Sequence, residues 1–581
     1  MRSLYLFVSL ALLLHISLLI NNCLVHSPSN GEIPALSAGI YHWQTGNFDL
    51  FRVNPPLVRC LAALPVLAMQ PKTDWSKHYD FLTGRDEFPI GIDFVYLNGE
   101  RSFLFFKVAR LACLPFSLLG AFVCFRWAKE LYGDISGLIA LSLWCLSPII
   151  LGHAATIGSD VPSAACGIFA CYQFWHWMQK TTWFQAVFTG LALGLAELTK
   201  TTWIILLSLL PILYLLWFVH VKNKRAWRQL FVILLLGIFC INLGYGFERF
   251  GTSLGDFRFI SRILGGKYSE DGQIKVGGNR FKNTLIEQIP VLLPANYVLG
   301  IDIQKSDFEF KNDNYLNGTW QSGGWWYYYL FALLVREPIG TLFLFFLSIF
   351  TTAYKEQFKN WKDEIVLLLP AICVFTLVSA QIGMNHHYRY IIPIFPFLFI
   401  WIGKVAQYHL KTTLLSLLLI IISSFVVYPH CLSYFNELIG GPKNGPKYLL
   451  GSNVDWGQDI LLLKKWHDKH PKTTPFFLKS TSYFDPAVAK IEYQIINSTY
   501  PQPGWYALSV NSIYSREKQY RYFLNFEPVA MTGYSMYIYH ITLEGANRVR
   551  REMGLPEIEA TTSEQNKTNE TLPTSKSANC Y

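Results

Sequence analysis

The stretch "SLYLFVSLALLLHISLLINNCLV" (residues 3–25) is an apolar run long enough to cross the hydrocarbon of a bilayer, about 30 Å, as one helix. Similar runs recur along most of the first 430 residues. Of the 581 residues, 52% are hydrophobic and only 15% are charged, which exceeds the apolar content that a soluble core requires. We therefore predict a polytopic α-helical membrane protein with about eleven spans.

The first run is expected to remain as an uncleaved anchor, because it is long and no clear small-residue cleavage site follows it. A cleaved signal peptide is the alternative. The predicted spans cover residues 3–25, 103–125, 135–152, 161–179, 183–199, 201–219, 230–247, 326–352, 365–382, 391–406 and 412–429.

Two short basic segments set the expected orientation. Residues 220–229 and 354–362 cluster Lys and Arg between spans, and such loops face the cytoplasm. Counting spans from them places the N-terminus inside and residues 430–581 outside, with a bacterial inner (plasma) membrane as the expected location. The formal net charge of +10 partly reflects this bias, so it gives no argument for nucleic acid.

The chain divides into a multi-span region, residues 1–430, and a polar C-terminal part. Its outer loops 26–102 and 248–325 are each about 75 residues long, too long for simple connectors, so we expect function there. Pro55 and Pro56 favour a helix that begins directly after them. A helix-like run at 459–470 and strand-like runs at 474–480, 504–510 and 535–541 predict a small extracytoplasmic α/β domain over 431–546, followed by a disordered tail, 547–581.

Sequence motifs typical of nucleotide-binding and metal-dependent enzymes are absent. The chain has no Walker loop, no HExxH and no Asp-x-Asp, so no nucleotide cofactor is expected. The eleven cysteines form no CxxC pair, and they imply neither a disulfide framework nor a zinc site.

Four charged residues remain, all predicted at the outer membrane face: Glu32, Asp160, Lys200 and Arg389. A charge at membrane depth costs roughly 2.5 to 3.5 kcal/mol on insertion scales, so such residues are functional candidates. One carboxylate and several cations beside lipid suit an anionic, lipid-linked phosphate. The alternatives are solvated or capping carboxylates at helix ends, and cations that snorkel to the interface.

Five segments carry a resemblance to a known superfamily. Together they resemble the protein O-mannosyltransferase and lipid A aminoarabinose transferase superfamily, membrane glycosyltransferases of the GT-C fold. The segments are "SPSNGEIPALSAGIYHWQTGNFDLFRVNPPL" (27–57), "GSDVPSAACG" (158–167), "GLALGLAELTKTTW" (190–203), "GWWYYYLFALLVREPIG" (324–340) and "HHYRYIIPIFP" (386–396).

The resemblance implies roles for particular residues. The superfamily's Asp-Glu motif matches Gly31-Glu32, so the Glu is present and the Asp is not. Glu32 is the expected base, while Asp160 matches the second acidic residue and either orients the acceptor, takes over as base, or holds a divalent cation with Glu32. The expected donor-phosphate ligands are Lys200, Arg389, Arg52 and Arg59, and the expected substrate contacts are Asn54, His386 and His387. The two histidines are alternatively interfacial polar residues.

The predicted function is transfer of a hexose or pentose from a polyprenyl-phosphate donor to an acceptor hydroxyl of a protein, lipid or glycan at the outer face. The alternative is a transporter or flippase for a lipid-linked or anionic solute, since charges at membrane depth also mark transport paths. The absence of internal repeats favours transfer. In the C-terminal part, candidate acceptor contacts are Asp455, Trp456, Gln458 and Asp459, with helix capping as the alternative role of Asp455.

Overall fold

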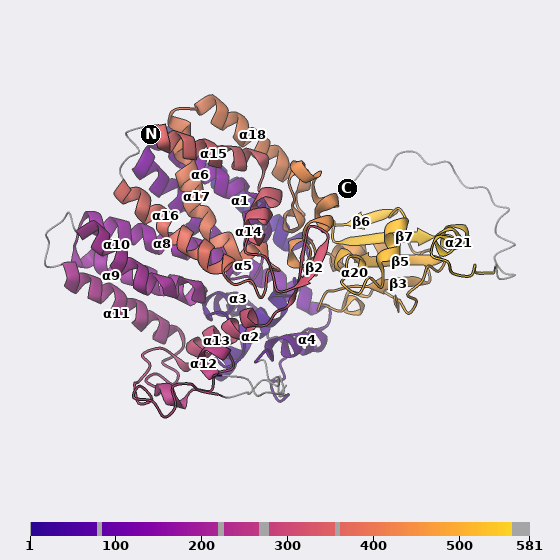
Figure 1. Cartoon of the computed structure of the whole chain (residues 1–581), viewed down its shortest axis with the longest axis horizontal. Coiled ribbons are helices and arrows are strands. Elements are labelled where there is room, and N and C mark those ends of the chain that lie inside the picture. Colours follow the sequence, from indigo (N-terminus) through magenta and orange to yellow (C-terminus); the bar gives the residue numbers. More distant parts are fainter. Residues whose placement is uncertain (1, 78–83, 219–225, 267–277, 355–360, 560–581) are drawn as a thin grey trace.

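A computed structural model describes residues 2–77, 84–218, 226–266, 278–354 and 361–559. Figure 1 shows a helical body with a small sheet at one end of the long axis. Each of the eleven predicted spans coincides with a helix or with two consecutive helices, of which η1 and η4 are 3-10 helices. They are α1 (Arg2–Val25), α5 (Arg101–Tyr132), α6 (Asp134–Leu146) with α7 (Pro148–Ala154), α8 (Asp160–Gln179), α9 (Trp183–Thr199), η1 (Thr201–Ile204) with α10 (Ile205–Phe218), α11 (Ala226–Gly244), α14 (Tyr328–Arg336) with α15 (Ile339–Tyr354), α16 (Trp361–Ser379), η4 (Tyr388–Ile394) with α17 (Phe395–Gly403), and α18 (Leu410–Val427).

By length and composition, fewer than eleven of the described helices are able to cross a membrane on their own. Among the described residues, five helices are long and apolar enough to span, and the bent pairs α6–α7 and α14–α15 raise the number to seven. Helix α9 has 17 residues and α10 has 14, while α16 carries Asp363 and Glu364 in its first turn. The predicted count of eleven spans is therefore not confirmed, although the helices themselves are present.

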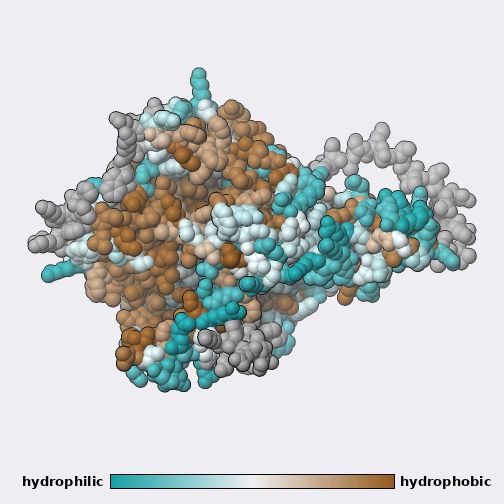
Figure 2. All heavy atoms as spheres, viewed as in Figure 1, coloured by the Kyte–Doolittle hydropathy of each residue, from teal (hydrophilic) through white to brown (hydrophobic). Residues whose placement is uncertain are grey.

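The outside of the helical body is apolar. Figure 2 shows hydrophobic residues gathered over the helical body and hydrophilic residues over the sheet. Large apolar side chains point outward from separate helices, with exposed fractions of 79% for Phe184, 64% for Phe231 and 72% for Val426. Such a continuous apolar exterior is stable only against lipid. The fold is that of an integral membrane protein.

Helices α9 and α11 approach each other closely because α9 carries Gly190 and Gly194 in a small-xxx-small pattern. A Cβ atom at Gly194 would lie 2.2 Å from the Cβ of Cys240, and one at Gly190 would lie 2.7 Å from the Cβ of Leu236. Larger residues at either position would separate the helices. This packing fixes the end of α9, where Lys200 follows.

The described residues of the first predicted outer loop form three helices, and those of the second are helical in part. They contain α2 (Glu32–Thr45), α3 (Leu57–Leu67), α4 (Glu87–Asn98), the short 3-10 helix η2 (Leu254–Asp256), α12 (Arg262–Gly265) and α13 (Ala295–Glu309), before the hairpin β1 (Asp313–Leu316) and β2 (Thr319–Ser322). The helix predicted after Pro55 and Pro56 is confirmed as α3. Helix α2 packs against α3 at Gly39, where a Cβ atom would lie 2.2 Å from the Arg59 carbonyl oxygen.

The C-terminal part contains a mixed five-stranded sheet of order β4-β3-β5-β7-β6. Strand β3 is parallel to β4 and β5, whereas β7 is antiparallel to β5 and β6. The predicted helix and all three predicted strands are present. The elements are α19 (Ile460–Lys469), β3 (Phe476–Lys479), β4 (Gln494–Ile495), β5 (Gly504–Ser509), α20 (Val510–Ile513), β6 (Ala530–Thr532), β7 (Met536–Ile541) and α21 (Leu543–Glu552).

The predicted disordered tail begins too early. Residues 547–552 belong to α21, and the backbone N–H of Ile558 donates to Asn547 Oδ1 at 2.8 Å, which folds the following segment back onto the helix. The strongly amphipathic sequence of α21 buries Ala546 and Val549 on one face of the helix. Residues 560–581 of the predicted tail lie outside the described residues, and the division of 431–546 into a separate domain stays a prediction.

The orientation is testable with exposed residues at opposite ends of the helices, because the basic segments that predict it lie largely outside the described residues. A cysteine at Tyr500, between β4 and β5, is expected to react with an impermeant maleimide in intact cells. A cysteine at Lys180, between α8 and α9, is expected to react only after permeabilisation. The parent chain serves as the control for background labelling of native cysteines. If the impermeant reagent labels Lys180→Cys but not Tyr500→Cys in intact cells, the predicted orientation is wrong.

Candidate active site

A cavity of about 180 Å³ lies where the ends of several helices meet the C-terminal part. Its walls come from the loop before α2, the start of α3, the loop before α8, the junction of α9 and η1, the start of η4, and the segment before α19. Residues more than 400 positions apart, such as Gly31 and Trp456, face the same space. The cavity therefore exists only in the folded chain.

The centre of the cavity wall is a carboxylate held between two cations. Lys200 Nζ donates to Asp160 Oδ1 at 2.6 Å, and Arg389 Nη1 donates to Asp160 Oδ2 at 3.0 Å. Asp160 begins α8, Lys200 follows α9, and Arg389 lies in η4. Burial acts to raise the pKa of Asp160, but the charges of Lys200 and Arg389 outweigh it and hold that pKa below its usual range.

The cavity is strongly cationic. Arg59 and Arg85 also line it, so four cations and one carboxylate line the cavity, and Arg85 is paired outside it with Glu87 and Asp307. Arg59 is held in place by His42 Nε2 at 2.8 Å and by the carbonyl of Asn54 at 2.5 Å, yet its Nη2 has no hydrogen-bond partner. Arg389 Nε is likewise buried without a partner. These guanidinium groups offer unused donors to an anion in the cavity.

The structure places Glu32 away from this cavity, against Arg110 of α5. Arg110 Nε and Nη2 donate to the two oxygens of Glu32, each at 2.7 Å. The backbone N–H of Ser29 adds a hydrogen bond at 2.8 Å and that of Ile157 another at 3.0 Å. Glu32 is 0% exposed, and burial raises its pKa while Arg110 and the hydrogen bonds lower it, with a net decrease.

This environment does not support the expected role of Glu32 as base. Both of its oxygens are already engaged, and its lowered pKa makes it a weak proton acceptor. The guanidinium of Arg110 also donates to the carbonyls of Cys23, His26 and Ser27. The pair therefore ties the end of α1 and the start of α2 to α5.

The other predicted site residues divide into two groups. Asn54 and His387 line the cavity, and His387 Nδ1 lies 2.6 Å from Ser452 Oγ. Arg52 and His386 do not line it. Arg52 Nε instead donates to Asn296 Oδ1 at 2.7 Å, because the chain turns between Arg52 and the prolines and directs this side chain toward α13.

Some residues of the site carry no clear signal in the sequence. Arg85 and Gln304 line the cavity without belonging to any motif. One feature of the sequence does indicate a role for Arg110. It is a cation inside a predicted span, where an unpaired charge is unfavourable, so a partner is expected. Trp456, an expected acceptor contact, also lines the cavity, with Arg389 Cζ 4.2 Å from the centre of a Trp456 ring.

Trp456 occupies the space beside Gly31, where the resemblance places an aspartate. A Cβ atom on Gly31 would lie 2.5 Å from Cζ2 of Trp456, so an aspartate fits only if the indole moves. Glycine at position 31 therefore leaves the space that Trp456 of the C-terminal part occupies.

The two carboxylates are poorly suited to share a divalent cation. Glu32 is neutralised by Arg110, and Asp160 by Lys200 and Arg389. These cations would repel a metal ion placed between the acids. Glu32 and Asp160 therefore do not fit the divalent-cation site that was one alternative from the sequence.

Residues 102–245 match the family of dolichyl-phosphate-mannose-protein mannosyltransferases. The matched segment extends from α5 to α11 and contains Arg110, Asp160 and Lys200. The match covers about a quarter of the chain and agrees with the resemblance to the GT-C membrane glycosyltransferase superfamily. No curated protein matches the chain.

Several solved structures are similar to the chain. ArnT from Cupriavidus metallidurans in the apo state is 14% identical, with 92% of this chain and 97% of that chain covered at a TM-score of 0.44. The same protein bound to undecaprenyl phosphate is 13% identical, with the same coverage and TM-score of 0.44. The oligosaccharyltransferase AglB from Archaeoglobus fulgidus, in complex with an inhibitory peptide and a dolichol-phosphate, is 10% identical, with 92% and 74% covered and a TM-score of 0.44.

The Glu32–Arg110 pair is expected to stabilise the fold. Glu32→Gln keeps the size of the side chain but leaves the buried Arg110 charge unpaired, which typically costs about 3 to 5 kcal/mol. Arg110→Met is expected to destabilise by a similar amount, while the double variant loses much less than the sum of the two. Denaturant unfolding of the detergent-solubilised proteins measures all three.

Glu437→Gln, at an exposed glutamate of the C-terminal part, is the control and should unfold like the parent chain. A Glu32→Gln protein that is as stable as the parent but loses transfer would contradict the structural role and return Glu32 to the reaction.

Proposed function

We propose that this chain is a polyprenyl-phosphate-dependent glycosyltransferase whose cavity beside Asp160 binds the donor at the extracytoplasmic face of the membrane. The acceptor is a hydroxyl of a protein, lipid or glycan. The bacterial inner membrane is the proposed location. The observation that carries the proposal is the pairing of Asp160 with both Lys200 and Arg389 inside a cationic cavity.

The cations suit a lipid phosphate. Arg59 and Arg389 are guanidinium groups with an unpartnered buried nitrogen each, and Lys200 adds a compact ammonium. Charge-assisted hydrogen bonds to phosphate are stronger than neutral ones, and arginine can form two in parallel. The phosphate would compete with Asp160 for Lys200 and Arg389. Polar side chains for the sugar hydroxyls are supplied by Asn54, Gln304 and His387, which line the same cavity.

This competition gives Asp160 its role. In the structure, Lys200 and Arg389 hold the pKa of Asp160 below its usual range, which keeps the carboxylate a weak base. As the donor phosphate draws the two cations away, that pKa rises toward its ordinary value and the carboxylate becomes a better proton acceptor. Donor binding thus activates the base, and Asp160 takes the role that the sequence assigned first to Glu32.

The transfer step then balances as follows. The acceptor oxygen forms a bond to the anomeric carbon while the bond from that carbon to the phosphate oxygen breaks. The phosphate leaves with the bonding electron pair, and Lys200 and Arg389 offset its charge. The proton of the acceptor hydroxyl passes to Asp160.

Asp160→Asn separates transfer from donor binding. Transfer is expected to fall by about 10² to 10⁴, the usual contribution of a general base. Binding of undecaprenyl phosphate should persist or strengthen, because the amide no longer competes for Lys200 and Arg389. Single-turnover assays with a panel of polyprenyl-phosphate sugars and equilibrium binding of undecaprenyl phosphate measure the two effects. Unchanged transfer would remove Asp160 from the mechanism.

Donor binding is expected to weaken when Lys200 or Arg389 is replaced by Gln, in contrast to Asp160→Asn. Each should weaken undecaprenyl phosphate binding by roughly 10- to 150-fold, which corresponds to the loss of one charge-assisted contact of about 1.5 to 3 kcal/mol. Arg101→Gln, at an outer arginine that does not line the cavity, is the matched control. Phosphate binding unaffected by both Lys200→Gln and Arg389→Gln would contradict a donor site in this cavity.

A further inference from the structure

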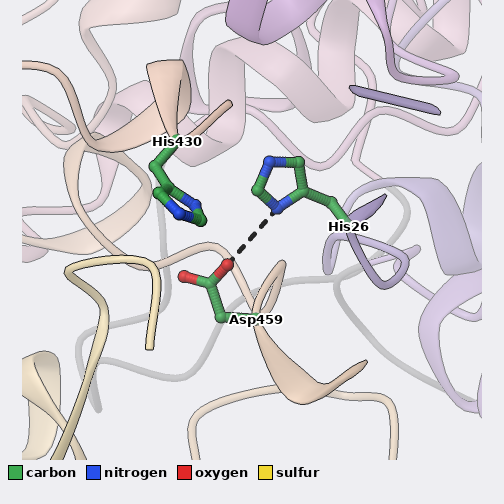
Figure 3. A group of neighbouring side chains, drawn as sticks. All are labelled: His26, His430 and Asp459. Atoms are coloured by element: carbon green, nitrogen blue, oxygen red, sulfur yellow. Dashed lines mark ion pairs between the residues drawn. The ribbon is translucent and has the colours of Figure 1, made fainter. Parts of the chain in front are cut away.

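A second group of polar side chains lies outside the cavity, at the junction of the helical body and the C-terminal part. His26 follows α1, His430 follows α18, and Asp459 directly precedes α19. Figure 3 shows the three side chains pointing toward one another. Each presents one metal-ligating atom, and these atoms all lie within 4.8 Å of one another.

The hydrogen bond made by His26 determines which of its nitrogens is free. Its Nε2 lies 3.0 Å from the carbonyl oxygen of Pro429, an acceptor only, so Nε2 carries the proton. In a neutral imidazole, Nδ1 then presents a lone pair. This Nδ1 lies 3.3 Å from Asp459 Oδ1 and has no hydrogen-bond partner. Two lone pairs facing each other at this distance require a cation between them or a second proton on the ring.

His430 and Asp459 each also have a buried atom that lacks a hydrogen-bond partner. His430 Nδ1 and Asp459 Oδ1 are both buried atoms without a hydrogen-bond partner. The other oxygen of Asp459, Oδ2, accepts from Ser535 Oγ at 2.6 Å, which orients the carboxylate. His26 is 7% exposed and Asp459 is 1% exposed. Leaving three such polar atoms unpaired in one buried place is unfavourable, and a shared ligand would satisfy all of them.

We propose that His26, His430 and Asp459 bind a divalent metal ion, for which zinc is the best fit. Two imidazoles and one carboxylate form a ligand set that zinc accepts in tetrahedral geometry, with water in the fourth position. Zinc bonds of about 2.0 to 2.1 Å separate neighbouring tetrahedral ligands by roughly 3.3 Å, the spacing of His26 Nδ1 and Asp459 Oδ1. The contacts to Pro429 and Ser535 are the outer partners that orient metal ligands in proteins.

The metal would fasten the C-terminal part to the first and last helices of the body. The segment after His26 already pairs with the segment before α19: Ser27 N donates to the Gln458 carbonyl at 2.9 Å, and Asn30 N to that of Trp456 at 2.7 Å. His26 and Asp459 flank this pairing. A metal ion there holds in place the strand-like contact that carries Trp456 to the wall of the cavity. Its role is positional, since none of its three ligands lines the cavity.

The test uses the full chain in detergent, with any polyhistidine tag removed. The protein is stripped with a chelator, dialysed, and titrated with Zn²⁺ and Co²⁺. One tightly bound Zn²⁺ per chain by mass spectrometry, and the visible bands of tetrahedral cobalt, are expected. A parent chain that binds neither ion at saturation would overturn the proposal, and would leave a protonated His26 paired with Asp459 as the explanation of the geometry.

Variants locate the ion. His430→Phe keeps a ring against His26 and Tyr534 but removes the ligand nitrogen, so the cobalt bands should disappear. Ser535→Ala removes only an outer partner and should weaken metal binding by about 10- to 100-fold. His470→Phe, at an exposed histidine of α19's C-terminal end, is the matched control and should bind like the parent chain. If His430→Phe does not fold, Ser535→Ala decides, and unchanged affinity in that variant overturns the site.

Discussion

The buried ion pair between Glu32 and Arg110 is the contact on which the geometry around the cavity depends. Arg110 lies in α5 among apolar helices, where an unpaired cation is costly. Its guanidinium donates to the Glu32 carboxylate and to three carbonyls in and just after the last turn of α1, while the same carboxylate accepts from the backbone of Ser29 and Ile157. Ile157 lies three residues before Asp160 in sequence. One pair thus fixes the first helix, the first outer loop and the approach to the cavity.

The two carboxylates of the resemblance have different environments, and this difference separates their roles. Glu32 has both oxygens bound to a guanidinium that nothing in the cavity can reach, so its charge is permanently compensated. Asp160 is bound to Lys200 and Arg389, which themselves line the cavity and can be shared with an anionic ligand. A carboxylate whose partners can exchange is responsive to a ligand, whereas one with fixed partners is structural.

The C-terminal part contributes directly to this site. Trp456 fills the space beside Gly31, and the loop that carries it is paired with residues that follow α1. The adjoining cluster of His26, His430 and Asp459 lies at the same junction. One wall of the cavity is therefore built by Trp456, which lies more than 400 residues beyond Gly31 in the sequence, so substitutions near Trp456 are expected to alter the cavity.

The sequence alone determined the secondary structure of the body and the identity of its central charges. Apolar runs of helical length became helices, Pro55 and Pro56 preceded α3, alternating runs became β3, β5 and β7, and Asp160, Lys200 and Arg389 came together as predicted. These features follow from local hydropathy and from the high free-energy cost of a charge at membrane depth, and both can be recognised in the amino-acid sequence. Only the tertiary structure decided that Glu32 belongs to Arg110, that Arg52 turns toward Asn296, and that Trp456 closes the cavity. The partner of a charge is set by distance in space, and a single sequence carries no record of which of its many cations lies within hydrogen-bonding reach.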